Sequence, residues 1–254
     1  MTILRYPSGQ PISTNVIQAL RFVGKVGFLS RESWHEFFGI GSRRWQEQQL
    51  QYAVEKRLFR KHRNPVARRF FVVGEEGAEF LKGLKAACVS PVPVMYLTHD
   101  HIVAQSMMRL NRAGLVRSFH VERELKTYGM KDFKLGEQDR DPKYPDAVFR
   151  INAFGGMRTV AVEYERERKS SSRYRNIVFQ YAGLTHLSMI LYIVENDGIR
   201  SAVESALKHL GTTALHDKMA FVSAEDWQKS PLTAAIKLKS GDVKLGEICT
   251  PFAA

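Results

Sequence analysis

The alternation of apolar and polar residues over positions 13–57 predicts three helices. Apolar residues recur at helical spacing over 14–23, and glycines at 24 and 27 end this first run. Ser30 opens a second, short apolar helix that ends at the glycines near position 40. The third helix is expected over residues 42–57, with Trp45, Gln49 or Leu50, Ala53 and Val54 on one side and polar, basic residues on the other.

A hairpin follows the third helix. Residues 58–62 and 68–73 flank a turn at Asn64-Pro65, and a helix is expected over 75–85. Three helices and a hairpin in this order are typical of a winged helix-turn-helix domain. We assign residues 1–88 to this domain and read the proline-containing stretch 89–93 as the linker.

The remaining chain, residues 89–254, predicts a second domain of mixed α/β class. Its expected elements are a helix over 98–114, an extended stretch over 116–121, a loop over 127–143, strands over 144–149 and 159–165, a helix over 170–183, a strand over 187–194, a helix over 198–210 and a strand over 218–222. Strands that alternate with helices favour βαβ units.

Composition narrows the class of partner. The 254 residues carry a formal net charge of +12, which favours an anionic partner, and double-stranded DNA is the first candidate. No stretch has the length or pattern of a membrane segment, so we expect no membrane partner. The two cysteines, Cys88 and Cys249, lack metal-type spacing, so a reducing cytoplasm is expected.

Basic residues gather on the third helix and the hairpin, where a winged helix would contact phosphates. The candidate DNA-binding residues are Arg43, Arg44, Lys56, Arg57, Arg60, Lys61, Arg63, Arg68 and Arg69. Gln46, Gln48 and Gln49 on the same helix are candidates for contacts with base edges. The aromatic residues Trp34, Trp45, Phe37 and Phe38 are expected in the core.

Acidic residues interrupt the two apolar strands of the second domain. Side chains alternate along a strand, so Glu163 and Glu165 share one face of the second strand with Ala161. Antiparallel pairing with the first strand would bring Asp146 beside Glu163. Buried acids are costly unless a cation or hydrogen bonds compensate them, so this pair predicts a seat for a divalent metal.

The chain resembles the PD-(D/E)XK nuclease superfamily through Pro145-Asp146, Glu163-Tyr164-Glu165 and the helix that carries Gln180 and Tyr181. More narrowly, it resembles the replication-relaxation proteins of plasmids and integrative elements, through these motifs and through His99-Asp100, Glu122-Arg123-Glu124-Leu125, Lys169-Ser170 and Arg173-Tyr174. The resemblance implies a winged helix joined to a restriction-endonuclease-like α/β domain in a bacterial protein. It also implies Mg²⁺ or Mn²⁺ held by Asp146 and Glu163, with Glu122 or Glu124 as a further acid.

One position departs from the superfamily pattern. An active member carries a lysine two residues after the strand acid, and Glu165 stands there in this chain. Lys169 is a candidate to replace it from the next turn, so Asp146, Glu163, Glu165 and Lys169 are the expected catalytic residues. An alternative alignment takes Glu167-Arg168-Lys169 as the acid-x-lysine motif and shifts the strand by four residues. In a domain without catalytic activity, the acids would instead pair with Arg166, Arg168, Lys169 or Arg173.

The sequence therefore predicts a DNA-binding protein of a mobile genetic element, acting in replication, mobilisation or its control, with metal-dependent phosphodiester cleavage as its candidate activity. The alternative is a non-catalytic transcriptional regulator or assembly factor. In that case the nuclease-like domain would form a homodimer or bind another protein encoded by the element.

Overall fold

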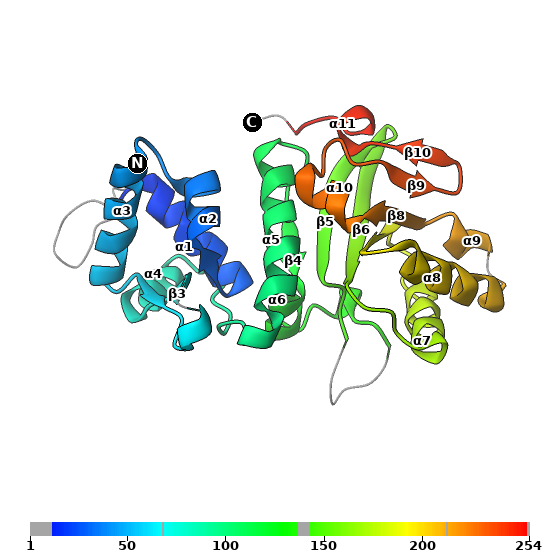
Figure 1. Ribbon diagram of the computed structural model, residues 1–254, viewed down its shortest axis with the longest axis horizontal. Coiled ribbons are helices and arrows are strands. Elements are labelled where there is room, and N and C mark those ends of the chain that lie inside the picture. The colour runs from blue at the N-terminus through cyan, green and yellow to red at the C-terminus, as the bar shows by residue number, and fades with distance from the viewer. Residues whose placement is uncertain (1–11, 68, 137–142, 212, 253–254) are drawn as a thin grey trace. The chain divides into compact units, whose positions relative to one another are not determined.

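The computed structural model describes residues 12–67, 69–136, 143–211 and 213–252 (Figure 1). The chain divides into two compact units, Met1–His101 and Ile102–Ala254. This division lies inside helix α5 (Leu97–Arg112), whereas the sequence analysis placed a boundary between residues 88 and 89.

The first unit combines helices with a three-stranded antiparallel sheet of order β1-β3-β2. Its elements are α1 (Thr14–Val26), β1 (Leu29–Ser30), α2 (Arg31–Ser33), the π-helical turn η1 (Trp34–Phe38), α3 (Arg43–Glu55), β2 (Phe59–Lys61), the 3-10 turn η2 (Pro65–Ala67), β3 (Phe70–Val73), α4 (Glu75–Gly83) and the 3-10 turn η3 (Val94–Tyr96). Serines cap the helices α2 and α3, since Ser30 Oγ and Ser42 Oγ accept the backbone N–H groups of Ser33 and Trp45. Three helices followed by the β2–β3 hairpin match the predicted order of elements.

Helix α3 is rotated relative to the expectation. Leu50 and Ala53 are buried as predicted, but 53% of Trp45 is exposed, so its assignment to the core is wrong. Gln46 lies at the inner position of the first turn instead. Its backbone carbonyl oxygen accepts the indole N–H of Trp34 at 3.0 Å. A helical step of 100° then carries Trp45 away from the core.

The segment that follows α4 packs on the first unit. The backbone N–H of Val89 donates to the carbonyl oxygen of Gly24 at 2.7 Å, and Val89 and Val92 are buried. Close approach is possible because Gly24 has no side chain: a β-carbon there would lie 2.2 Å from the carbonyl oxygen of Ala87. Residues 87–92 are therefore part of the first unit's packing.

The second unit is built on a seven-stranded mixed sheet of order β10-β9-β8-β7-β6-β5-β4. Its elements after α5 are β4 (Phe119–Val121), α6 (Glu122–Thr127), the 3-10 turn η4 (Lys131–Phe133), β5 (Ala147–Ala153), β6 (Gly156–Glu165), α7 (Ser171–Ala182), β7 (Met189–Val194), α8 (Asp197–Leu210), α9 (Thr213–His216), β8 (Met219–Ser223), α10 (Ala224–Lys229), β9 (Ile236–Leu238), β10 (Gly241–Val243) and α11 (Leu245–Ile248). The predicted mixed α/β fold class is confirmed.

No helix in the described parts of the chain is long and apolar enough to cross a bilayer.

Strands β6, β7 and β8 are parallel, so each connection between them needs a crossover. Helices α7 and α8 supply these crossovers and pack against each other on one face of the sheet, while α10 lies on the other face (Figure 1). Ala161, Ile190 and Tyr192 from the strands meet Tyr174 and Val203 from the helices in one buried cluster. The same face of β6 carries Glu163 and Glu165, so the predicted acids enter the edge of this core.

Two glycine substitutions test the packing of residues 87–92. Gly24→Ala should lower the free energy of unfolding by about 1–3 kcal/mol, because its β-carbon would overlap the backbone at Ala87. Gly83→Ala in α4 is the control, since a β-carbon there meets no atom within 4 Å, and alanine should stabilise the helix by up to about 1 kcal/mol. Urea denaturation measures both. Equal effects of the two substitutions would contradict the observed packing.

Candidate functional site

The β5–β6 pairing brings the predicted acids together. Ala147 pairs with Val162, and Asp146 lies one residue beyond this pair, next to Glu163. The Asp146 carboxylate is held by the backbone, since its Oδ2 accepts the N–H of Tyr164 at 2.7 Å. The strand pairing thus fixes two carboxylates side by side at the end of the hairpin.

Glu163 is almost fully buried, with 2% of its surface exposed. The Tyr181 hydroxyl donates to its Oε1 at 2.6 Å, and the ammonium of Lys143 lies 3.7 Å from its Oε2. Burial raises the pKa of Glu163 to about 7; the charge of Lys143 works against this shift and that of Asp146 adds to it. Glu163 therefore holds its proton close to neutral pH.

Glu165 is also buried and forms an ion pair with the ammonium of Lys169. Burial raises the pKa of Glu165, and Lys169 partly offsets this effect. Lys169 thus reaches back to the acids from the loop before α7. Because β6 ends at Glu165, the alternative motif over residues 167–169 lies outside the strand, and that alignment is wrong.

Tyrosines enclose the two glutamates from α7 and β7. Tyr174, Tyr181 and Tyr192 are each at most 1% exposed. Burial, followed by the charge of Glu163, raises the pKa of Tyr181 and of Tyr192 well above the usual value. The buried Tyr192 hydroxyl and the Lys143 ammonium make no hydrogen bond to any described residue. The cluster therefore has hydrogen-bonding capacity left for a water molecule or a ligand.

The acids of α6 lie close in the chain but have their own partners. The backbone N–H of Glu122 donates to the carbonyl oxygen of Asp146 at 2.9 Å, while its carboxylate pairs with Lys126 at 3.0 Å. Glu124 is buried, 3.1 Å from Nδ1 of His120. Within residues 12–67, 69–136, 143–211 and 213–252, no three histidine, cysteine, aspartate or glutamate residues are grouped as a metal centre.

Two residues of the site were not predicted from their position in the sequence. The sequence predicts Lys143 in a polar loop and Tyr192 only as part of a buried strand. Lys143 gives no sequence signal beyond its closeness to Pro145-Asp146. The register Glu163 to Tyr192 places the tyrosine beside the acid, and this register depends on the parallel pairing of β6 with β7.

Most of the predicted DNA-binding residues lie on the surface of the first unit. Arg43, Arg44, Lys61, Arg63 and Arg69 are exposed. Lys56 lies over the ring of Tyr52, 5.2 Å from its centroid, Arg60 is half-buried, and Arg57 forms an ion pair with Glu75. Arg68 lies outside the described residues.

The glutamines of α3 differ in whether their side-chain amides are available to contact DNA bases. Oε1 of Gln46 lies 2.6 Å from Nδ1 of His35, and its amide Nε2 donates to the carbonyl oxygen of Gly41. Oε1 of Gln49 accepts from Asn15 at 3.0 Å. The side-chain amides of Gln46 and Gln49 therefore form hydrogen bonds within the first unit. Gln48 is exposed, as is the unexpected Trp45.

Comparisons with known proteins add little to this geometry. No protein-family model and no curated protein matches the chain. One solved structure that resembles it is that of the restriction endonuclease FokI bound to DNA, at 11% identity and a TM-score of 0.27. The match covers 85% of this chain and 43% of the other. At this identity and TM-score, the similarity establishes neither a common fold nor a common function.

Glu163→Gln should flatten the pH dependence of stability. Because burial raises the folded-state pKa of Glu163 from 4.5 to about 7, its contribution is complete below pH 4.5 and is lost as the pH rises through 7. Glutamine carries no charge and still accepts from Tyr181. The variant should therefore match wild type at low pH and exceed its free energy of unfolding by about 1–3 kcal/mol at pH 8.

Guanidinium denaturation at a series of pH values measures this difference. Glu225→Gln is the control, because Glu225 is an exposed carboxylate whose hydrogen bond with Lys229 lowers its pKa. That variant should keep the wild-type fall in stability across neutral pH. A Glu163→Gln variant that loses stability as steeply as wild type would show that Glu163 is ionised at neutral pH.

Proposed function

We propose that this chain binds double-stranded DNA through α3 and the β2–β3 hairpin, and that its second unit hydrolyses phosphodiester bonds with a divalent metal ion. The observation that carries the proposal is the buried cluster of Asp146, Glu163 and Glu165 with Lys143 and Lys169. Burying so many charged groups at the edge of a core costs free energy of folding. Ionisable groups with shifted pKa values gather at catalytic sites, so the cluster is a candidate for one.

DNA binding is supported by charge and by exposure. The net charge of +12 favours nucleic acid, and Arg43 and Arg44 are exposed on the first turn of α3. Exposed arginines bind phosphate oxygens through paired N–H groups. Trp45 and Gln48 on the same helix would contact bases or sugars next to these phosphates.

Hydrolysis is supported by the electrostatics of the acids. The pKa values of Glu163 and Glu165 are both raised, so the cluster contains more acid than its lysines compensate. Carboxylate oxygens suit Mg²⁺ and Mn²⁺, and the unused hydroxyl of Tyr192 leaves room for a bound water molecule. Asp146 and Glu163 would hold the metal; Glu122 would join them only if its carboxylate left Lys126.

A bound metal ion would polarise the phosphate and lower the pKa of a water molecule. The chain's own groups have separate roles. Glu165 would accept the proton of the attacking water, and Lys169 would hold Glu165 in place and balance charge on the phosphate. The charge of Lys143 would limit the rise in the pKa of Glu163, so that the carboxyl group can lose its proton when a metal binds.

The role on a mobile genetic element, in replication, mobilisation or its control, is part of the proposal and rests on the resemblance described above. One observation favours a second candidate. Lys143 and Lys169 already form ion pairs with Glu163 and Glu165, as they would in a domain that has lost nuclease activity. The chain would then be a regulator or assembly factor, and this unit would form a homodimer or bind a partner protein.

Replacing Arg43 and Arg44 together with alanine tests the DNA surface. The slope of log K against log salt should fall by up to about two, since each lost phosphate contact removes roughly 0.9. Fluorescence anisotropy with a duplex at several salt concentrations gives the slope. Lys82→Ala on α4, which removes an exposed lysine near Glu79, should leave the slope unchanged. An unchanged slope in the double variant would remove α3 from the interface.

Asp146→Asn tests the catalytic proposal. The amide oxygen still accepts the N–H of Tyr164, so the hairpin should fold, but the metal loses a charged ligand. Wild type should nick supercoiled plasmid in Mg²⁺ or Mn²⁺, and the variant should lose at least about 100-fold of this rate.

Calorimetric titration of Mn²⁺ into both proteins, with and without duplex DNA, separates binding from chemistry. Metal binding that is lost in the variant, together with nicking by wild type, supports the nuclease. Neither binding nor nicking by wild type would favour the regulator, and DNA binding through Arg43 and Arg44 would stand independently of that result.

A further inference from the structure

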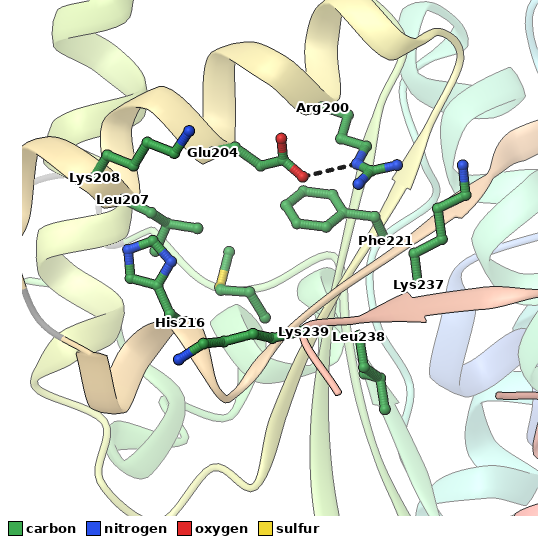
Figure 2. Close-up of a pocket in the computed structure, with 10 residues that line it drawn as sticks. Arg200, Glu204, Leu207, Lys208, His216, Phe221, Lys237, Leu238 and Lys239 are labelled. Carbon is green, nitrogen blue, oxygen red and sulfur yellow. Dashed lines mark hydrogen bonds and ion pairs between the residues drawn. The ribbon is translucent and has the colours of Figure 1, made fainter. Parts of the chain in front are cut away.

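A cavity lies on the second unit, between α8, α9 and the strands β8 and β9. Its volume is about 280 Å³, and Figure 2 shows the side chains around it. The lining residues are Arg200, Glu204, Leu207, Lys208, His216, Met219, Phe221, Lys237, Leu238 and Lys239. None of them belongs to the acid cluster described above.

The cavity is apolar at its base and basic around its rim. Leu207, Met219 and Phe221 are nearly buried and form the base. Alternation along β9 places Lys237 on the side of the strand that faces α8, whereas Leu238 points away; Lys239 follows the strand (Figure 2). Arg200 lies over the Phe221 ring, 5.7 Å from its centroid.

Charge in the cavity is unbalanced. Arg200 pairs with Glu204 at 2.8 Å, and Lys239 pairs with Asp217 at 2.7 Å. Lys208 and Lys237 are exposed and form no ion pair with any residue that the structure describes. Two of the four basic side chains are therefore compensated by carboxylates, and the ammonium groups of Lys208 and Lys237 remain to attract an anion.

The strand register relates this cavity to the acid cluster. Glu163 pairs with Tyr192, Tyr192 with Phe221 and Phe221 with Lys237, so these side chains share one face of the sheet. Neighbouring strands lie about 4.8 Å apart, which places Phe221 about 10 Å and Lys237 about 14 Å from Glu163. The rings of Tyr192 and Phe221 are in contact, with centroids 5.8 Å apart.

We propose that this cavity binds a nucleotide. Its phosphate would lie between the ammonium groups of Lys208 and Lys237, and its base would lie on Leu207, Met219 and Phe221, next to the Arg200 guanidinium. The apolar floor of the cavity suits the nucleobase, and the cations around its rim suit the phosphate. Inorganic phosphate would contact only the rim. A free nucleotide and the 5′-terminal nucleotide of a DNA strand present the same chemistry.

Calorimetry with the full chain at low salt tests the proposal, with dAMP as the probe. Wild type should bind dAMP more tightly than deoxyadenosine or inorganic phosphate, because each of these lacks one half of the ligand. The double variant Lys208→Gln, Lys237→Gln should weaken dAMP binding by at least about tenfold, through the loss of two charge-assisted contacts. Lys244→Gln, an exposed lysine outside the cavity, is the control and should bind as wild type does.

Competition identifies the source of the nucleotide. A short DNA strand with a 5′-phosphate that displaces dAMP, while the same strand without it does not, would identify the strand end. Displacement by neither strand would identify a free nucleotide. No dAMP binding by wild type, or equal weakening in the Lys244→Gln control, would overturn the proposal. Asp146→Asn should keep dAMP binding, so failure of the proposed cleavage and failure of this site are distinguishable.

Discussion

The register of β5 against β6 is the constraint on which the candidate site depends. It sets Asp146 beside Glu163, and the hydrogen bond from the Tyr164 N–H to Asp146 fixes the carboxylate at the end of the hairpin. A slip of one residue would turn Glu163 and Glu165 to the opposite face of the sheet, away from Tyr181 and Lys169. Apolar residues on both faces of β6 make such a slip costly, so the packing of the hairpin also maintains the geometry of the acids.

The two lysines reach the acids at the open end of the hairpin, from the two segments that flank it. Lys143 precedes β5 and lies near Glu163, whereas Lys169 follows β6 and pairs with Glu165. Neither lies in a strand of the sheet; Lys143 forms a β-bridge with Leu135, and the backbone N–H of Lys169 donates to the Tyr174 hydroxyl. Ion pairs at the edge of a core gain little net energy, because desolvation offsets the attraction of the charges. The pKa values of both glutamates are raised because the effect of burial exceeds that of the neighbouring lysines.

Much of this arrangement could be predicted from the sequence, because the alternation of side chains along a strand is a local property. The shared face of Glu163 and Glu165 and the hairpin that carries them followed from it. The position of Trp45 did not, because Gln46 takes the inner position through hydrogen bonds to residues of the preceding helical turn. Lys143 and the cavity beside Lys237 depend on contacts between distant segments, which the local pattern of residues does not encode.

The docking of Val89 onto Gly24 also bears on how the chain can be divided. The N–H of Val89 satisfies a carbonyl group in the last turn of α1, and the buried side chains of Val89 and Val92 cover part of the first unit. A fragment that stops at residue 88 would expose that apolar surface to water and leave the Gly24 carbonyl group without the N–H of Val89. Autonomous folding of the first unit therefore depends on a stretch whose composition resembles a linker, and the shortest independent fragment extends through that stretch.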